Sequence, residues 1–307
     1  MLKNYLKVAF RSLLRNKLTS FINIAGLALA MTCCLLIVFF IHDESSYDRY
    51  HSKADHIYRV TRNFLSPDGS VNLHLGHVSP PFGPLLKNDF TDFEQVVRTL
   101  QSRLLVSVQE NGEQKKAFNE ANSFFAEPEI FELFDIPVVQ GNGVKALTEP
   151  FQVMMSEKTA KRYFGDEQAV GKSLRVTDKF DVAVSAVFKD FPAQSHWHPD
   201  ILLSFSTLND STIYGRKGLE TNWGNNSFST YVLVKEPFDA KRTASLFPSF
   251  LDRHMGNTDD PEASKPSTWT TLFLQKVTDI HLHSQLDSEI ESNGNITNVY
   301  MMGVVGA

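Results

Sequence analysis

The sequence is poor in cysteine. Only Cys33 and Cys34 are present among its 307 residues. They are neighbours inside an apolar stretch, where a thiol behaves as a small hydrophobic side chain. No loop-closing disulfide and no cysteine-based zinc site can be built from this pair. The chain beyond Cys34 must therefore be stabilised by its own apolar core, for which about 250 residues are ample.

Acidic residues are missing from the first 42 positions. That segment holds five Lys and Arg residues and no Asp or Glu, and the whole chain carries a net charge of −5, so removing those five positive charges leaves −10 for residues 43–307. Proteins that bind nucleic acids need clustered Lys and Arg against the phosphates. We therefore expect no nucleic-acid partner, and look to proteins, lipids or small molecules.

Residues 21–41 form a run of 21 residues without a charged side chain. As a helix this run would be about 31 Å long at ~1.5 Å per residue, which matches the hydrocarbon core of a bilayer. A signal peptide cleaved at Ala28-Leu29-Ala30 is the alternative, but signal cores are shorter, roughly 7–15 residues. We predict transmembrane helix 1 over residues 19–42. The basic residues before it place the N-terminus in the cytoplasm and the chain after Asp43 outside it.

Residues 1–18 carry a second pattern. Apolar residues recur at helical spacing, while Lys3, Lys7, Arg11 and Arg15 recur every four residues. This predicts a cytoplasmic amphipathic basic helix that lies on anionic lipid headgroups. The alternative is that the transmembrane helix simply extends into water.

The last residues of the sequence are apolar as well. Residues 299–307 contain no charge and no proline, and Tyr300 suits the boundary between headgroups and hydrocarbon. Nine residues are too few to cross a bilayer. We predict the start of a truncated second transmembrane helix over residues 297–307, with a frayed apolar tail as the alternative.

Between the apolar ends, patterns of strands and helices alternate. Strands are predicted at 56–62, 104–108, 173–177, 180–188 and 228–234, turns at 66–69 and Asn111–Gly112, and helices at 127–134, 156–165 and 240–253. Ser156 and Asp239 are typical N-caps, and Gly165 is a typical helix end. These patterns predict an α+β domain with mixed short strands rather than regular βαβ units.

One segment resembles a phosphate-binding loop. Residues 165–173 read GDEQAVGKS, but five residues separate Gly165 and Gly171 where the loop needs four, and a predicted helix precedes the segment where a strand is required. The sequence also lacks a G-x-S-x-G nucleophile elbow. We assign no catalytic residue and no cofactor-binding residue, and we expect no cofactor.

Histidine pairs are the remaining candidates for chemistry. His196 and His198, and likewise His281 and His283, are spaced so that each pair would share one side of a strand, a geometry that metals use. Two ligands do not make a site, and no H-E-x-x-H sequence or nearby carboxylate at helical spacing completes either pair. His74 and His77 are interpreted in the same way. We assign no metal-binding residue and interpret all of these as surface or loop histidines.

Several stretches together resemble a known family. Residues 10–21 (FRSLLRNKLTSF), 47–51 (YDRYH) and 54–60 (ADHIYRV) resemble the start of MacB/FtsX-type ABC transporter permeases. Residues 153–166 (VMMSEKTAKRYFGD) followed by 170–174 (VGKSL) are similar to the signature of the periplasmic core domain of that family. The resemblance covers essentially the whole chain, and it is specific to the family but not to a substrate.

The resemblance implies an architecture. It implies one transmembrane helix, a large periplasmic domain and three further spans in the bacterial cytoplasmic (inner) membrane. The periplasmic core domain would cover residues 43–296. Within it, residues 44–109 and 228–290 would form a porter-like part, and residues 110–227 an inserted second subdomain.

The resemblance also implies a function. A permease subunit of this type passes ATP-driven motion from the cytoplasm to the periplasmic domain for efflux of a peptide, a drug or a lipid-linked cargo. The alternative is an FtsX-like regulator of a cell-wall hydrolase that transports nothing. ATP hydrolysis would belong to a cytoplasmic ABC ATPase, so the chain itself is not expected to be an enzyme. Further expected partners are the bilayer, a periplasmic adaptor or outer-membrane channel, and a second permease half or a second copy of the chain.

Overall fold

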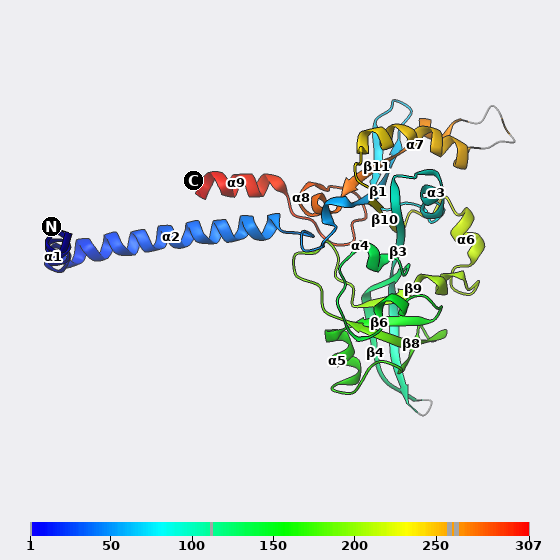
Figure 1. Cartoon of the computed structure of the whole chain (residues 1–307), viewed down its shortest axis with the longest axis horizontal. Helices are drawn as coiled ribbons and strands as arrows, with labels where there is room; N and C mark the ends of the chain where they lie inside the picture. The colour runs from blue at the N-terminus through cyan, green and yellow to red at the C-terminus, as the bar shows by residue number, and fades with distance from the viewer. Residues whose placement is uncertain (1, 111–112, 257–259, 261–263, 307) are drawn as a thin grey trace. The chain divides into compact units, whose positions relative to one another are not determined.

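The structure, a computed structural model, describes residues 2–110, 113–256, 260 and 264–306. The chain forms two compact units (Figure 1). Unit 1 comprises the residues up to Ser46 together with those from Gly294 onward, and unit 2 comprises Tyr47–Asn293. The turn predicted at Asn111–Gly112 lies outside the described residues.

Unit 1 is helical. It contains α1 (Leu2–Arg15), α2 (Lys17–Ser45) and α9 (Ile296–Gly306). Helix α2 has 29 residues and a mean hydropathy of 2.8 in its most apolar window, and none of its residues is buried. At ~1.5 Å per residue it is about 43 Å long. Its length and composition make it a candidate transmembrane span.

Helices α1 and α2 are separated by a break at Asn16, whose backbone is not helical. A separate amphipathic helix requires such a break, although its place on a membrane surface stays a prediction. Helix α9 runs antiparallel to the second half of α2, since Gly303 faces Ile41 and Gly306 faces Ile37. The small residues allow the two helices to approach closely. With 11 residues α9 is shorter than a span, so the second transmembrane helix also stays a prediction.

Unit 2 is built on one mixed sheet. Its strands are β1 (Ile57–Leu65), β2 (Val71–Leu75), β3 (Phe93–Glu110), β4 (Glu113–Ala126), β5 (Val138–Gly141), β6 (Gln152–Ser156), β7 (Ser173–Val176), β8 (Phe180–Phe188), β9 (Ile201–Ser204), β10 (Phe228–Val234) and β11 (Thr270–Lys276). The order is β11-β1-β10-β3-β4-β9-β6-β8-β5, with β2 paired to β1 and β7 paired to β3 and β8. The predicted α+β class is confirmed. The strand pattern at 104–108 and the turn that follows it predict a hairpin here, and β3 and β4 do pair antiparallel; the length of the two strands was not expected.

The helices of unit 2 are α3 (Phe82–Asp89), α4 (Ile130–Leu133), α5 (Glu157–Phe164), α6 (Arg216–Thr221), α7 (Ala240–Met255) and α8 (Ile280–His283). The predicted N-caps of α5 and α7 are confirmed, since Ser156 Oγ accepts from the Thr159 N–H and the Asp239 carboxylate accepts from two N–H groups of α7. Helix α4 is a single turn, shorter than the predicted 127–134. It ends because Phe134 adopts an extended backbone and its ring is buried in the core.

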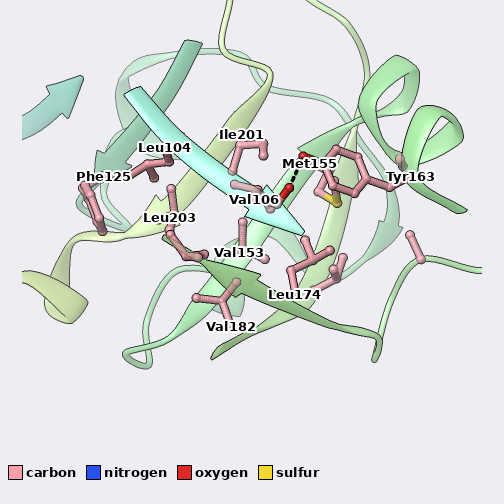
Figure 2. Packing of buried hydrophobic residues seen from close by; sticks show 14 of the residues in the cluster. Leu104, Val106, Phe125, Val153, Met155, Tyr163, Leu174, Val182, Ile201 and Leu203 are labelled. Atoms are coloured by element: carbon pink, nitrogen blue, oxygen red, sulfur yellow. Dashed lines mark hydrogen bonds between the residues drawn. The ribbon is translucent and has the colours of Figure 1, made fainter. Parts of the chain in front are cut away.

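Three apolar clusters fill unit 2. Figure 2 shows the first, where β3, β4, β6, β7, β8 and β9 meet helix α5. The second cluster contains Ile57 and Tyr231 as well as Met154 and Trp197, so it joins residues of the predicted porter-like part to residues of the predicted inserted part. Strand β3, nearly all of which falls in the predicted porter-like part, pairs with β10 of that part near its start and with β7 of the predicted inserted part further on. The division into two parts stays a prediction.

Candidate functional site: two connectors held by one histidine loop

The residues that directly follow α2 are fixed in the core of unit 2. We call residues 47–56 the exit connector. Asp48 has a φ of 59°, a conformation that Asp tolerates better than most residues. Its N–H donates to the carbonyl oxygen of Gln194 at 2.9 Å, and its Oδ1 accepts from the His196 N–H at 3.1 Å and lies 2.8 Å from His196 Nδ1. The two side chains are 0% and 1% exposed.

The same histidine reaches the centre of the sheet. His196 Nε2 lies 2.8 Å from the hydroxyl of Tyr231 on β10. Burial raises the pKa of Tyr231, so its hydroxyl keeps its proton and can donate it in a hydrogen bond. An imidazole that donates from Nδ1 to Asp48 accepts that bond at Nε2. The chain Asp48–His196–Tyr231 is therefore satisfied at both ring nitrogens and ties the exit connector to the central strand.

A second attachment joins the exit connector to Asp135, two residues after the end of α4. The Asp135 N–H donates to His51 Nδ1 at 3.1 Å, and Ser52 Oγ donates to the Asp135 carboxylate at 3.0 Å. Burial lowers the pKa of His51 to about 4, so its ring is neutral near pH 7 and can accept at Nδ1. The Tyr50 hydroxyl donates to Ser195 Oγ at 3.2 Å. Several independent contacts therefore hold these few residues.

The residues that precede α9 are fixed by the neighbouring histidine. We call residues 284–293 the return connector, and residues 194–198 the histidine loop. The His198 N–H donates to Glu291 Oε1 at 2.7 Å, and His198 Nδ1 lies 2.9 Å from Oε2. The hydrogen bond to Glu291 raises the pKa of His198. Two histidines separated by one residue thus hold the two connectors.

The residue between these histidines anchors the loop itself. Trp197 is fully buried, and its ring packs against Phe124, Phe134 and Phe191 at 5.1, 5.9 and 5.6 Å between ring centroids. The contacts with Phe124 and Phe191 are edge-to-face, an arrangement that stabilises a core beyond simple burial. Because Trp197 cannot move without disturbing three aromatic neighbours, His196 and His198 are held in fixed positions.

A buried arginine adds a second hold on the return connector. Arg59 on β1 is 0% exposed and donates to Glu289 Oε1 at 2.9 Å, to Gln275 at 2.7 Å and to Ser284 at 3.0 Å. Burial alone would raise the pKa of Glu289, but the hydrogen bond and charge of Arg59 outweigh it, and the pKa lies below its usual value. The carboxylate is therefore ionised near pH 7 and compensates the buried guanidinium.

The histidines considered as metal ligands have other partners. His196 and His198 lie in a loop rather than a strand and bind different carboxylates. The strand expected for His281 and His283 is wrong: the two residues lie in the one-turn helix α8, closed by the bond from the Ser284 N–H to the Ile280 carbonyl oxygen. A three-residue alternation is too short to distinguish a strand from such a turn.

Three of these histidines, His77, His196 and His281, are buried rather than on the surface, although His77 and His196 do lie in loops as predicted. His77 bonds to Ser229 at 2.9 Å, and burial lowers the pKa of His77 to about 4. The ring of His281 stacks on Tyr47 of the exit connector. In the parts of the chain that the structure describes, no three His, Cys, Asp or Glu side chains are grouped so that they could hold a metal ion.

The segment that resembles a phosphate-binding loop connects a helix to a strand. Gly165 ends α5 with a φ of 66°, and Gly171 has a φ of 89° in the turn before β7. Lys172 pairs with Glu167 and lies over the ring of Phe164 at 4.8 Å. This is the helix–turn–strand order that the sequence predicts.

A comparison with models of known protein families shows which family the chain belongs to. A family model for the MacB-like periplasmic core domain matches residues 20–247. The chain belongs to this family. It is therefore a MacB-like periplasmic domain of an ABC-type permease, and the resemblance noted in the sequence is confirmed.

Several solved structures are similar to this MacB-like domain, and the first of them shares its fold. A domain of a protein classed as a permease from Porphyromonas gingivalis is 20% identical, with a TM-score of 0.61 over 82% of this chain and 98% of that chain. The periplasmic region of MacB from Actinobacillus actinomycetemcomitans is 15% identical, with a TM-score of 0.48 over 74% and 91%. The extracellular domain of the noncanonic ABC-type transporter YknZ from Gram-positive bacteria is 13% identical, with a TM-score of 0.43 over 71% and 99%. No curated protein sequence matches the chain.

Sequence reasoning missed the residues that form the connectors' attachments. One signal was available for the return connector. Asp287, Glu289 and Glu291 are three acidic residues at every second position, which indicates a segment that needs partners for its carboxylates, although its backbone is not extended, since Ser288 has a φ of 61°. Asp48 gave no such signal, because its partner His196 lies 148 residues further along the chain.

Proposed function

We propose that the chain is the permease subunit of a MacB-type ABC transporter, in which movement of the membrane segment is passed to the periplasmic core domain. The observation that carries this proposal is the attachment of both connectors to the histidine loop through Asp48–His196 and Glu291–His198. Packed domains move as units. A connector that is fixed in the core conveys displacement, whereas a flexible one would absorb it.

The proposal places the chain in the bacterial cytoplasmic membrane. The N-terminus is cytoplasmic, residues 19–42 span the bilayer, and residues 43–296 are periplasmic. A cytoplasmic ABC ATPase supplies the motion, and the exported cargo is a peptide, a drug or a lipid-linked molecule. A periplasmic adaptor or outer-membrane channel receives the cargo, and a second permease half or a second copy of the chain completes the membrane part.

A flexible insertion tests the transmission. A Gly-Ser insertion after His42, in the intact transporter, should abolish export and leave ATP hydrolysis in place, because the ATPase still turns over but its motion no longer reaches unit 2. The matched control is the same insertion after Pro67, in the exposed turn between β1 and β2, which should leave export intact. Unchanged export after the insertion at His42 would remove rigid coupling from the account.

Capture of partners separates export from regulation. The full-length chain is purified with its partners after cross-linking in intact cells. An adaptor or an outer-membrane channel among them supports export, which the size of the inserted part also favours. A cell-wall amidase or peptidase in their place would establish the FtsX-like regulator and overturn the transport proposal.

A further inference from the structure

Strand β3 changes partners along one edge. Its residues up to Leu100 pair with β10, and Val106 and Ser107 pair with β7. Among the described strands, none pairs with residues 101–105 on this edge, although the Thr177 N–H donates to the Leu105 carbonyl oxygen at 2.7 Å. The sheet therefore has a gap here, between the start of β10 and the turn that joins β7 to β8.

A pocket of roughly 380 Å³ opens at this gap. That volume lies at the lower end of the range found for small-molecule sites. Three side chains of 8% exposure or less, Leu104, Phe125 and Leu208, are apolar lining residues. Figure 2 shows Leu104 and Phe125 at the end of the first apolar cluster opposite Tyr163. The pocket is therefore lined in part by residues of the first apolar cluster.

Two cations stand at this pocket without partners. Arg103 and Lys179 both line it, both are exposed, and neither forms an ion pair within the described residues. None of the described residues that line the pocket is Asp or Glu. Two nearby carboxylates are engaged elsewhere: Asp181 pairs with Arg175 at 3.1 Å, and Asp210 accepts two hydrogen bonds within its own turn.

We propose that this pocket binds a small amphipathic anion, a carboxylate that carries one short acyl chain. The carboxylate pairs with Arg103 and Lys179, since an anion is what two unpaired cations complement. The acyl chain lies against Phe180 and Ile213, two apolar lining residues that are partly exposed, and this contact removes apolar surface from water. A bound molecule of this kind contacts β3 and the 3₁₀ helix at Phe205–Asn209 together and fills the gap in the sheet.

The test uses a photoreactive ligand on the full chain. The chain is reconstituted in nanodiscs of phosphatidylcholine, exposed to decanoic acid that carries a diazirine, irradiated, and digested for mass spectrometry. Labelled residues are expected in the segments 100–104 and 208–214. Labelling of α2 by probe dissolved in the lipid serves as the internal reference. The double variant R103E/K179E should lower pocket labelling roughly tenfold, the effect of losing charge-assisted contacts.

Two comparisons make the outcome decisive. The variant K158E/K241E reverses two exposed lysines outside the pocket and carries the same change of charge, so it should label like the original chain. The matching diazirine alcohol, which lacks the negative charge, should label the pocket weakly. Label confined to α2, equal labelling by the acid and the alcohol, or equal loss in both double variants would each overturn the proposal. Displacement of the label by a short peptide but not by unlabelled decanoate would overturn it in favour of a peptide site.

Discussion

The two connectors of unit 2 are held by different kinds of interaction. The exit connector depends on a dry network in which Asp48 and His196 are 0% and 1% exposed. The return connector depends on ionic pairs whose exposure increases along the chain, from 12% at Glu289 to 33% at Glu291. A buried charge that loses its partner costs several kcal/mol, whereas a half-exposed pair contributes little. The exit connector and the Glu289 end of the return connector are therefore stiff attachments, whereas the Glu291 end of the return connector can be adjusted by pH and salt.

This contrast is consistent with the proposed function, because one attachment is stiff while the pair His198–Glu291 can open and re-form. Under the proposed function, motion that arrives through α2 meets a connector that cannot shift without breaking the Asp48–His196–Tyr231 chain. Motion that reaches α9 meets the pair His198–Glu291, which can open and re-form at small cost. The histidine loop contacts both connectors, through His196 at one and His198 at the other.

The largest expected effect is at Asp48. D48A should lower the free energy of unfolding by about 3–5 kcal/mol, because it leaves His196 without its buried acceptor and places Ala at a positive φ. D48N should cost clearly less, since Asn tolerates this backbone conformation and its oxygen can still accept from the His196 N–H. Chemical denaturation of the full chain gives both values. D55A, at an exposed acid of the same connector, is the control. A cost below 1 kcal/mol for D48A would contradict the dry network.

A smaller effect is expected at Glu289. E289Q should cost about 2 kcal/mol near pH 7, because the amide keeps the shape but removes the charge that compensates Arg59. The pKa of Glu289 is lowered in the folded state, so its contribution is present above the usual value of 4.5 and is lost as the pH falls through the lowered pKa. The difference between E289Q and the original chain should therefore shrink in acid. A cost that is independent of pH would mean that packing, and not charge, holds this connector.

The smallest effect is expected at His198. H198Q should cost about 0.5–1 kcal/mol in mild acid. The pKa of His198 is raised, so the pair with Glu291 stabilises most below the usual value of 6.5 and weakens as the pH rises through the raised pKa. E291Q removes the same pair and should follow the same pH dependence. Opposite pH trends for the two variants would show that they do not act through one interaction.

Local sequence predicted the elements whose pattern is clear and bounded. Strands β8 and β10 have the predicted ends, Phe180–Phe188 and Phe228–Val234, because each is a run of β-branched and aromatic residues between polar segments. The N-caps Ser156 and Asp239 are equally local. Residues 113–120 were not predicted as strand, since their Glu, Gln, Lys and Asn residues have low strand propensity, and pairing with β3 overrides it.

The attachments of the connectors could not be predicted in this way. Asp48 and His196 are separated by 148 residues, and Arg59 and Glu289 by 230, so no spacing rule joins them. The two histidines of the loop attracted attention as possible ligands for one metal ion. Only the fold reveals that they bind two carboxylates on different segments. Contacts between residues that are far apart in the sequence can be identified only once the order of the strands in the sheet is known.

Hydrogen exchange of the full chain in lipid nanodiscs tests the central claim most directly. The Asp48 amide, bonded to Gln194 at 2.9 Å, and the Asp287 amide, bonded to His74, report on the two connectors. The account predicts that the Asp48 amide exchanges as slowly as the amides in the core of β10. The exchange rate of the Asp287 amide should lie within about tenfold of the rate of the Asp48 amide. Exchange of both amides as fast as the exposed turn at residues 66–69 would contradict the claim that the connectors are part of the rigid core.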